Sequence, residues 1–221
     1  MSAGVRLVLL GKQGAGKGTQ AARLAEHHGV RHVSTGELFR SAAAAGTEVG
    51  LEAQKYMESG NLVPDDVVIR VVEEQLSDDG SLSDGFVLDG FPRTEPQAIE
   101  LERLLAADPL DVVVNLEVSR DIVLDRIAGR RVCEQCGATY HVNMPPKSNW
   151  TCDVCGGKVV QRDDDTEAAV SRRLELYEQE TVPLIDFYRR LGKLVAVDGE
   201  GDGDLVFKRL VEAIDSRLSS S

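Results

Sequence analysis

The feature that most constrains the fold is a glycine-rich loop close to the N-terminus. An apolar run at residues 6–10 leads into GKQGAGKGT at residues 11–19, and a helical pattern follows. Glycines let backbone N–H groups converge on phosphate oxygens without Cβ clashes, and the N-terminus of the next helix favours the same negative charge. A strand, a loop of this composition and a helix, in that order, predict a phosphate-binding P-loop in an α/β protein.

Two residues of this loop point to a nucleotide as the ligand. Lys17 is placed to reach the β- and γ-phosphates, and Thr19 to face the shell of a Mg²⁺ ion. The general pattern has Ser or Thr directly after the lysine, whereas Gly18 intervenes here. A glycine-rich loop alone would also fit a ligand-free turn between strand and helix. The lysine, the threonine and the preceding strand favour nucleotide binding.

Apolar, β-branched runs alternate with longer amphipathic stretches, which is typical of a parallel sheet covered by helices. The expected strands are 6–10, 32–34, 86–88, 112–116 and 194–197. The expected helices are 17–28, 36–44, 47–59, 65–77, 95–107, 119–128, 166–190 with a break or kink at Pro183, and 204–218. Residues 34–63 and 129–165 interrupt the alternation, so we predict two excursions from one core made of 1–33, 64–128 and 166–221.

Composition narrows the class of protein. Over 221 residues the net charge is −12 and the pI is near 4.8, so the surface should repel phosphate backbones. A well-solvated surface is the simpler reading of the acid excess, and adaptation to salt is the alternative. The apolar run at 6–10 is too short for a membrane span and has the wrong layout for a signal peptide. We expect a cytosolic protein.

All four cysteines lie in the second excursion, as two Cys-x-x-Cys pairs: Cys133, Cys136, Cys152 and Cys155. The 15-residue gap between the pairs fits a Cys₄ zinc site. Four thiolates complete a tetrahedral ion and leave no open position for water or substrate, so a structural metal is predicted. Two redox pairs are the alternative, and a nucleic-acid-reading ribbon has few cations to support it. His141 could replace a ligand, but packing or solvent contact is its simpler role.

A second signature, GFVLDGFPRTEPQA at residues 85–98, places an aspartate at the end of a buried strand and an arginine four residues later. At this point the sequence strongly resembles the adenylate kinases, within the nucleoside monophosphate kinases. The resemblance covers nearly the whole chain. It includes STGELFR at 34–40, GNLVPD at 60–65, DRIAGRR at 125–131, RDDD at 162–165, RRL at 172–174 and VDG at 197–199.

The resemblance implies two nucleotide sites. Residues 34–63 would fold over AMP and 129–165 would form a lid over ATP. The AMP site would contain Thr35, Arg40, Asn61, Leu62, Val63, Gly90, Phe91, Pro92, Arg93, Gln97, Arg162 and Arg173. The ATP site would contain Gly14, Ala15, Gly16, Lys17, Gly18, Thr19, Arg126, Arg130, Thr139, Tyr140 and the backbone at Ala196. The Gln97 amide has a donor and an acceptor, which suits an adenine edge.

The implied reaction is reversible transfer of a phosphoryl group from Mg·ATP to AMP, giving two ADP. Such a transfer needs two nucleotides in line and the developing charge neutralised. The implied catalytic residues are five cations: Lys17, Arg93, Arg130, Arg162 and Arg173. Asp89 resembles the family's Mg²⁺-organising aspartate, acting through water. The cysteines resemble the metal-bearing form of the family's long lid, with Zn²⁺ as the structural ion.

One position departs from the family, which commonly has proline where this chain has Gln13. Loss of a locked φ should leave the loop slightly less preorganised. The nearest alternative function is a related kinase with another acceptor, or with GTP as donor. An alternative from a different class is a zinc-ribbon ATPase or nucleic-acid-binding module. We expect a monomer whose partners are ATP, AMP and ADP, without a nucleic-acid or membrane partner.

Overall fold

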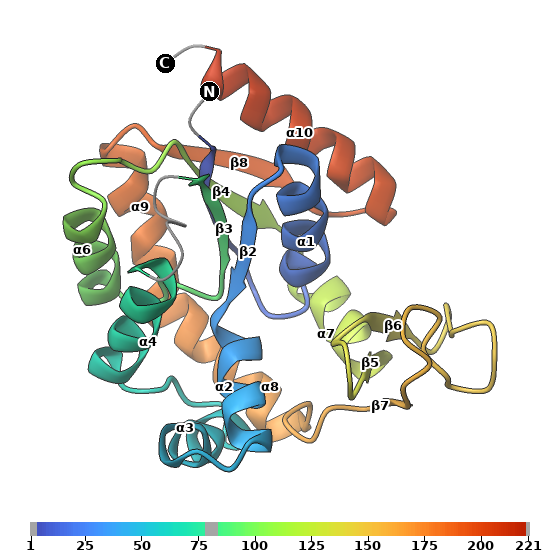
Figure 1. Cartoon of the computed structure of the whole chain (residues 1–221). Coiled ribbons are helices and arrows are strands. Elements are labelled where there is room, and N and C mark those ends of the chain that lie inside the picture. Colours follow the sequence, from blue (N-terminus) through green and yellow to red (C-terminus); the bar gives the residue numbers. More distant parts are fainter. Residues whose placement is uncertain (1–3, 78–83, 220–221) are drawn as a thin grey trace.

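The centre of the molecule is a five-stranded parallel sheet in the order β2-β3-β1-β4-β8 (Figure 1). The computed structural model describes residues 4–77 and 84–219. The strands are β1 (Arg6–Leu10), β2 (Arg31–Ser34), β3 (Phe86–Asp89), β4 (Val112–Glu117) and β8 (Leu194–Asp198). Every pairing in this sheet is parallel, so the carboxyl ends of the strands share one edge. The predicted α/β fold is confirmed, and each predicted core strand is displaced at either end by no more than one residue.

Side chains that alternate along the strands bury two separate cores, one on each face of the sheet. Val8 and Leu10 belong to one core, and Leu7 and Leu9 belong to the other. The first face is covered by α4 (Asp65–Ser77), α6 (Glu95–Leu104) and α9 (Val182–Arg190), and the second by α1 (Lys17–His28), α7 (Arg120–Ala128) and α10 (Gly203–Leu218) (Figure 1). Full burial of one such aliphatic side chain contributes roughly 1.5–3 kcal/mol. The two cores therefore hold the strand ends, and the loops after them, in fixed positions.

The first excursion consists of two helices, α2 (Thr35–Ala44) and α3 (Glu48–Glu58). Thr47 caps α3, because its hydroxyl accepts a hydrogen bond from the Gly50 N–H at 3.1 Å. The helices approach closely at Gly50, where a Cβ would lie 2.2 Å from the Ala42 carbonyl carbon. Only glycine permits this approach, so α2 and α3 form one tightly packed pair.

The second excursion contains a three-stranded antiparallel sheet in the order β6-β5-β7. Its strands are β5 (Arg130–Cys133), β6 (Thr139–His141) and β7 (Val159–Val160). The sheet projects to one side of the molecule between α7 and α8 (Glu167–Leu176) (Figure 1). These strands were not predicted, because each is short and lies in a segment rich in polar and turn-forming residues, which is typical of a loop.

The long helical stretch near the C-terminus is interrupted, but ahead of Pro183 rather than at it. A π-helical segment, η2 (Tyr177–Thr181), joins α8 to α9. Pro183 lies in the first turn of α9, where its missing N–H costs little. The predicted break is thus replaced by a widened turn that comes just before the proline. As for membranes, the helices within the described residues are all too short or too polar to span a bilayer.

Candidate active site

The P-loop follows β1 and ends where α1 begins. Gly16, the residue before α1, has a φ of 99°, a left-handed conformation that glycine adopts without strain. The ammonium of Lys17 donates hydrogen bonds to the carbonyl oxygens of Gly11 at 2.7 Å and Lys12 at 2.9 Å. The loop thus folds around its own lysine and holds that charge beside its backbone N–H groups, where a bound phosphate would accept from both.

Asp89, the last residue of β3, lies beside the first turn of α1. It pairs in register with Leu9 of β1, and a Cβ on Gly18 would lie 3.4 Å from its Oδ2. Burial lowers the pKa of Lys17 to about 8, and the Asp89 carboxylate offsets part of that decrease. Asp89 therefore offers a hard oxygen ligand of the kind that Mg²⁺ prefers, next to the phosphate-binding loop.

Lys17 lies at the edge of a cluster of five arginines from different elements, of which Arg93 and Arg130 act on it directly. The five are Arg40 of α2, Arg93 after β3, Arg130 of β5, Arg162 after β7 and Arg173 of α8. Burial lowers the pKa of Arg40 and Arg93, and that of Arg162 to about 10, and in each case neighbouring arginines lower it further. Cations at such close range repel one another, so the cluster favours a ligand that carries several negative charges.

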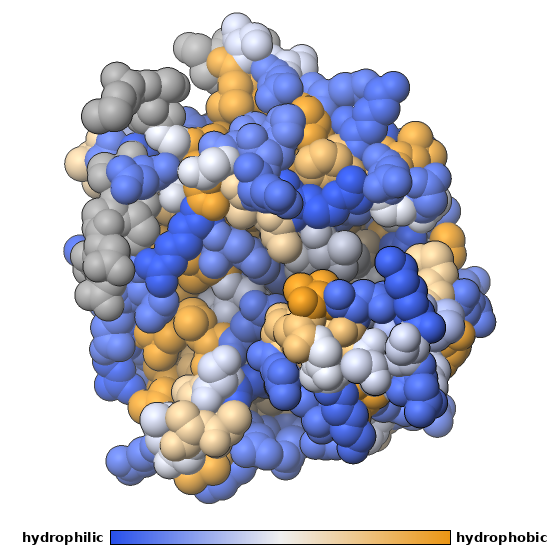
Figure 2. All heavy atoms as spheres, turned by 45° about the vertical axis from the view of Figure 1, so that its right-hand side comes forward, coloured by the Kyte–Doolittle hydropathy of each residue, from blue (hydrophilic) through white to orange (hydrophobic). Residues whose placement is uncertain are grey.

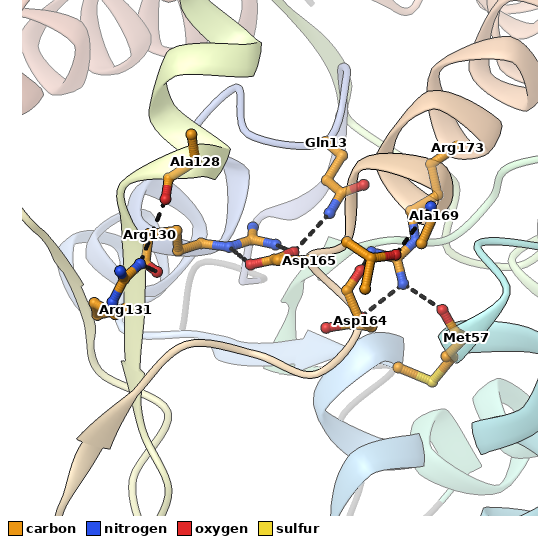
Figure 3. A network of polar contacts seen from close by, with 10 residues as sticks. Gln13, Met57, Ala128, Arg130, Arg131, Asp164, Asp165, Ala169 and Arg173 are labelled. Atoms are coloured by element: carbon orange, nitrogen blue, oxygen red, sulfur yellow. Dashed lines mark hydrogen bonds and ion pairs between the residues drawn. The ribbon is translucent and has the colours of Figure 1, made fainter.

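Two buried aspartates fix two of these arginines (Figure 3). Arg130 donates from Nε to Asp165 Oδ2 at 2.8 Å, and from Nη2 to the other oxygen of the same carboxylate. Arg173 donates to Asp164 Oδ2 at 2.6 Å and to the Met57 carbonyl, also at 2.6 Å. Met57 belongs to α3, so Arg173 joins the first excursion to the segment that leaves the second.

Arg162 differs from this pair. Its Nε is buried and donates to no acceptor within residues 4–77 and 84–219. Its side chain lies near Arg40, Arg130 and the two aspartates, which shape its pKa. A buried donor without a partner costs free energy unless a ligand satisfies it. Arg162 is accordingly available to a phosphate oxygen.

The residues predicted to hold the acceptor nucleotide surround the loop after β3. Thr35 Oγ1 donates to the Gly90 carbonyl at 3.0 Å, and Arg93 Nε donates to the same carbonyl at 2.8 Å. Gln97 is almost fully buried and accepts from the Arg93 backbone N–H at 2.8 Å. Phe91 and Pro92, joined by a cis peptide bond, complete the loop.

The turn at 61–63 contributes three further residues predicted to hold the acceptor nucleotide. Asn61 Oδ1 accepts from Arg172 Nε of α8 at 3.0 Å, and Val63 is buried in the core below Leu62. Most of the predicted acceptor residues therefore come from α2, the 61–63 turn, the β3–α6 loop and the start of α6, whereas Arg162 and Arg173 reach the site from the segment after β7 and from α8.

Arg126 and Ala196, both predicted to belong to the donor site, lie on different elements, α7 and β8. Arg126 donates to the Ala15 carbonyl at 3.1 Å and to the carbonyls of Gly199 and Gly201, in the loop after β8. Ala196 lies within β8, opposite Asn115. Gly199 and Gly201 are residues that sequence reasoning missed. The VDG signature at 197–199 was the only signal for this loop.

Thr139 and Tyr140 lie in β6, and Tyr140 contacts the cysteines. Its hydroxyl donates to Cys152 Sγ at 3.4 Å and accepts from the Asp153 N–H at 2.8 Å. The four cysteine Sγ atoms lie within 4.8 Å of one another, which suits one tetrahedral metal ion. The Tyr140 hydroxyl holds the pKa of Cys152 at about 6, favouring the thiolate that a metal requires.

His141 lies outside this cluster. Its ring contacts the Asp125 carbonyl at 3.5 Å and the Asn143 N–H at 3.2 Å. The set of four ligand atoms consists of cysteine sulfurs alone. The simpler prediction for His141, packing without a metal, agrees with these contacts.

Two further groups of side-chain hydrogen bonds were not predicted from the sequence patterns. The Asp65 carboxylate accepts from Gln97 Nε2 at 2.7 Å and from Thr94 Oγ1 at 3.0 Å. Gln13 of the P-loop donates to Asp165 at 3.2 Å (Figure 3).

Seen from the side of the second excursion, the surface is largely hydrophilic and is hollowed where that excursion stands in front of the core (Figure 2).

Comparison with known proteins gives one consistent answer. The family described as adenylate kinase matches residues 9–193. Adenylate kinase of Carboxydothermus hydrogenoformans is 47% identical over 213 residues, covering 95% of this chain and 99% of that protein. The enzyme of Alkaliphilus oremlandii is 46% identical over 217 residues (97% and 100%), and that of Methanosarcina acetivorans 46% over 209 residues (93% and 96%). With the P-loop, the arginine cluster and the DGFPR loop in place, the chain belongs to the adenylate kinase family.

Proposed function

We propose that this chain transfers a phosphoryl group reversibly from Mg·ATP to AMP, forming two ADP. The observation that carries the proposal is the cluster of five arginines that adjoins Lys17 of the P-loop and includes Arg93 of the loop after β3. A nucleotide hydrolase needs one phosphate site, whereas a transferase must hold two nucleotides in line. Membership of the adenylate kinase family supports the same reaction.

In the proposed mechanism the protein neutralises charge and positions the reactants. The backbone of residues 14–19 and the Lys17 ammonium bind the donor phosphates, with Arg130 approaching from the lid side. Arg40, Arg93, Arg162 and Arg173 approach from the acceptor side. Arginine suits this role because its planar fork pairs with two oxygens and stays protonated. The transition state, with charge spread over the transferring oxygens, is then surrounded by preorganised cations.

Mg²⁺ fits this site as the ion that accompanies ATP. Asp89 faces the start of α1, and Thr19 adds a hydroxyl in that helix. Oxygen donors of this kind suit a hard divalent cation that keeps much of its water. When bound, Mg²⁺ neutralises charge on the donor phosphates. Asp89 would hold it through water and orient it toward the P-loop.

Zn²⁺ is the proposed ion of the cysteine cluster. The four sulfurs are close enough for one ion and offer soft thiolate ligands, which suit zinc. The surrounding small core consists of Val159, Ala138 and Tyr140 beside two of the cysteines. A core of this size needs help to fold. The metal would therefore stabilise the 129–165 segment and take no part in the chemistry.

We further propose that residues 34–63 and 129–165 act as two flaps on one core, in a monomeric, cytosolic enzyme. Each flap is joined to the rest of the chain near the arginine cluster. The net charge of −12 argues against nucleic-acid and anionic-membrane partners. Light scattering of the purified protein at several concentrations would test the monomer.

One assay tests the proposed reaction against its alternatives. Purified protein is given Mg·ATP with AMP, CMP, UMP or GMP, and then Mg·GTP with AMP, and the diphosphates are quantified. We expect AMP to be preferred by at least about tenfold in kcat/KM, or about 1.4 kcal/mol of differential transition-state binding. Equal turnover of CMP or UMP would contradict the adenylate assignment. ATP consumption without any acceptor would favour the ATPase alternative.

A further inference from the structure

Gln13 joins the P-loop to the segment that returns from the lid. Its Nε2 donates to Asp165 Oδ1 at 3.2 Å, although the two residues are 152 positions apart in the sequence (Figure 3). An ionised carboxylate only accepts hydrogen bonds, so the amide nitrogen rather than the oxygen must face it. The amide oxygen, Oε1, is buried and accepts from no donor in the described part of the chain. The hydrogen bond to Asp165 is therefore the contact that orients this side chain.

Asp165 is the centre of a three-residue chain. Its side chain is 0% exposed, and it accepts from Gln13 and from two nitrogens of Arg130. Arg130 itself is 14% exposed and belongs to the cluster beside Lys17. A buried carboxylate held by three charge-assisted or polar bonds has little freedom to rotate. The position of the Arg130 guanidinium thus depends on Asp165, and that of Asp165 depends in part on Gln13.

The P-loop of adenylate kinases commonly has proline where this chain has Gln13. Proline stiffens a loop through its own φ and carries no side-chain donor. Gln13 cannot stiffen the loop in that way, but it can connect the loop to a partner outside it. The observed contact reaches across from the donor phosphate loop to the carboxylate that pairs with Arg130.

We propose that Gln13 is a positioning residue for phosphoryl transfer, acting through Asp165 on the Arg130 guanidinium. The proposal rests on the role proposed above for Arg130 at the donor phosphates. By holding Asp165 from the P-loop side, Gln13 sets the distance between the loop that binds the phosphates and the arginine that approaches them from the lid. Misplacement of one charge near a reacting centre lowers the rate of the chemical step more than it weakens ground-state binding.

The test is a double-mutant cycle. Gln13→Met removes the donor and keeps the chain length, Gln13→Glu replaces the donor by an acceptor, and Arg130→Ala removes the positioned group. We expect Gln13→Met to lower kcat about three- to tenfold with the KM for AMP changed less than about twofold, and Gln13→Glu to lower kcat further. In the Arg130→Ala background, Gln13→Met should change kcat by less than about 1.5-fold, because its target is gone.

Asp163→Asn is the matched control. Asp163 is exposed and lies next to Asp164 and Asp165 in the sequence, and its substitution should leave kcat unchanged. Melting temperature is measured on every variant. A full effect of Gln13→Met in the Arg130→Ala background would mean that Gln13 acts on the loop alone, and normal kcat in both Gln13 variants would also overturn the proposal. Normal kcat in Arg130→Ala would instead contradict the proposed role of Arg130, so the two failures are distinguishable.

Discussion

Gln97, a residue predicted to bind AMP, donates a 2.7 Å hydrogen bond from its Nε2 to Asp65 Oδ1. Gln97 also accepts from the backbone N–H of Arg93, so its amide plane is fixed at both ends. The second hydrogen of the amide nitrogen and the remaining lone pair of Oε1 are what it can still offer a base. We therefore expect Gln97 to recognise adenine only while Asp65 holds its amide in place.

Asp65→Ala should weaken acceptor recognition as well as the fold. It leaves buried Gln97 and Thr94 each without an acceptor, which costs about 1–3 kcal/mol per group. We expect a lower melting temperature and a KM for AMP raised about five- to tenfold, with a smaller preference over CMP. Asp66→Ala, at the next and exposed position of α4, is the control. An unchanged KM for AMP in a folded Asp65→Ala variant would separate Gln97 from adenine recognition.

The pKa of Lys17, lowered to about 8 by burial, predicts a pH dependence of activity. The charged ammonium is the form that binds phosphate, so kcat/KM for ATP should fall as pH rises through about 8, approaching tenfold per pH unit. Steady-state kinetics between about pH 6.5 and 9.5 measure this. The Lys17→Arg variant, whose charge persists, should retain its residual activity across that range. A flat profile for the unmodified protein would contradict the assignment.

The lowered pKa of Lys17 also predicts that the lysine is required for activity but does not stabilise the fold at neutral pH. Between about pH 8 and 10.5 the unfolded chain binds a proton that the folded chain has lost, so this residue's contribution to stability rises with pH over that window. Below about pH 8 the buried ammonium disfavours folding. Lys17→Met should therefore melt at pH 7 no lower than the unmodified protein, while kcat falls on the order of a hundredfold or more. Calorimetry and coupled kinetics on one preparation test both halves.

The sequence predicted the core of this enzyme well, because its signals are local. A continuous apolar run predicts a strand buried on both faces, as Val8 and Leu9 are, and the glycines around Lys17 define the loop. The contacts that orient the site are long-range. Gln13 with Asp165, and Asp65 with Gln97, join segments that no periodicity connects.

Arg126 also shows what a sequence motif cannot predict. Its place in a motif predicts a role in the donor site, but the motif does not show that its guanidinium donates to the carbonyls of Gly199 and Gly201, after β8. A motif gives the identity of a residue and the element that carries it. Which backbone atoms converge on that residue depends on how two distant elements pack, and one-dimensional spacing does not contain that information.

The two flaps should close together when both nucleotides bind. The lid turn at Gly137 already lies close to α2, since a Cβ on Gly137 would be 3.4 Å from Glu37 Oε1. Arg173 further links Met57 of one flap to Asp164 at the base of the other. A bisubstrate analogue, two adenosines joined by a polyphosphate chain, should slow hydrogen exchange in both 34–63 and 129–165, because closure excludes water. Protection of one segment alone would contradict a two-flap enzyme.

The last prediction concerns the cysteines and separates a structural metal from a catalytic one. Cys152 is buried, and its thiolate is favoured by the Tyr140 hydroxyl, so Cys152→Ser removes both a proposed metal ligand and the group that Tyr140 contacts. The core of the 129–165 segment is small, and binding of the proposed metal would be coupled to its folding. We expect Cys152→Ser to lose tightly bound zinc and to melt at a lower temperature. Its kcat, measured well below that temperature, should fall far less than that of Lys17→Met.

The control is His141→Ala. The His141 ring lies outside the sulfur cluster, so this variant should keep the metal. A Cys152→Ser protein that melts normally yet has no turnover would make the metal catalytic, and an oxidised cysteine pair in freshly purified, metal-free protein would favour a redox role.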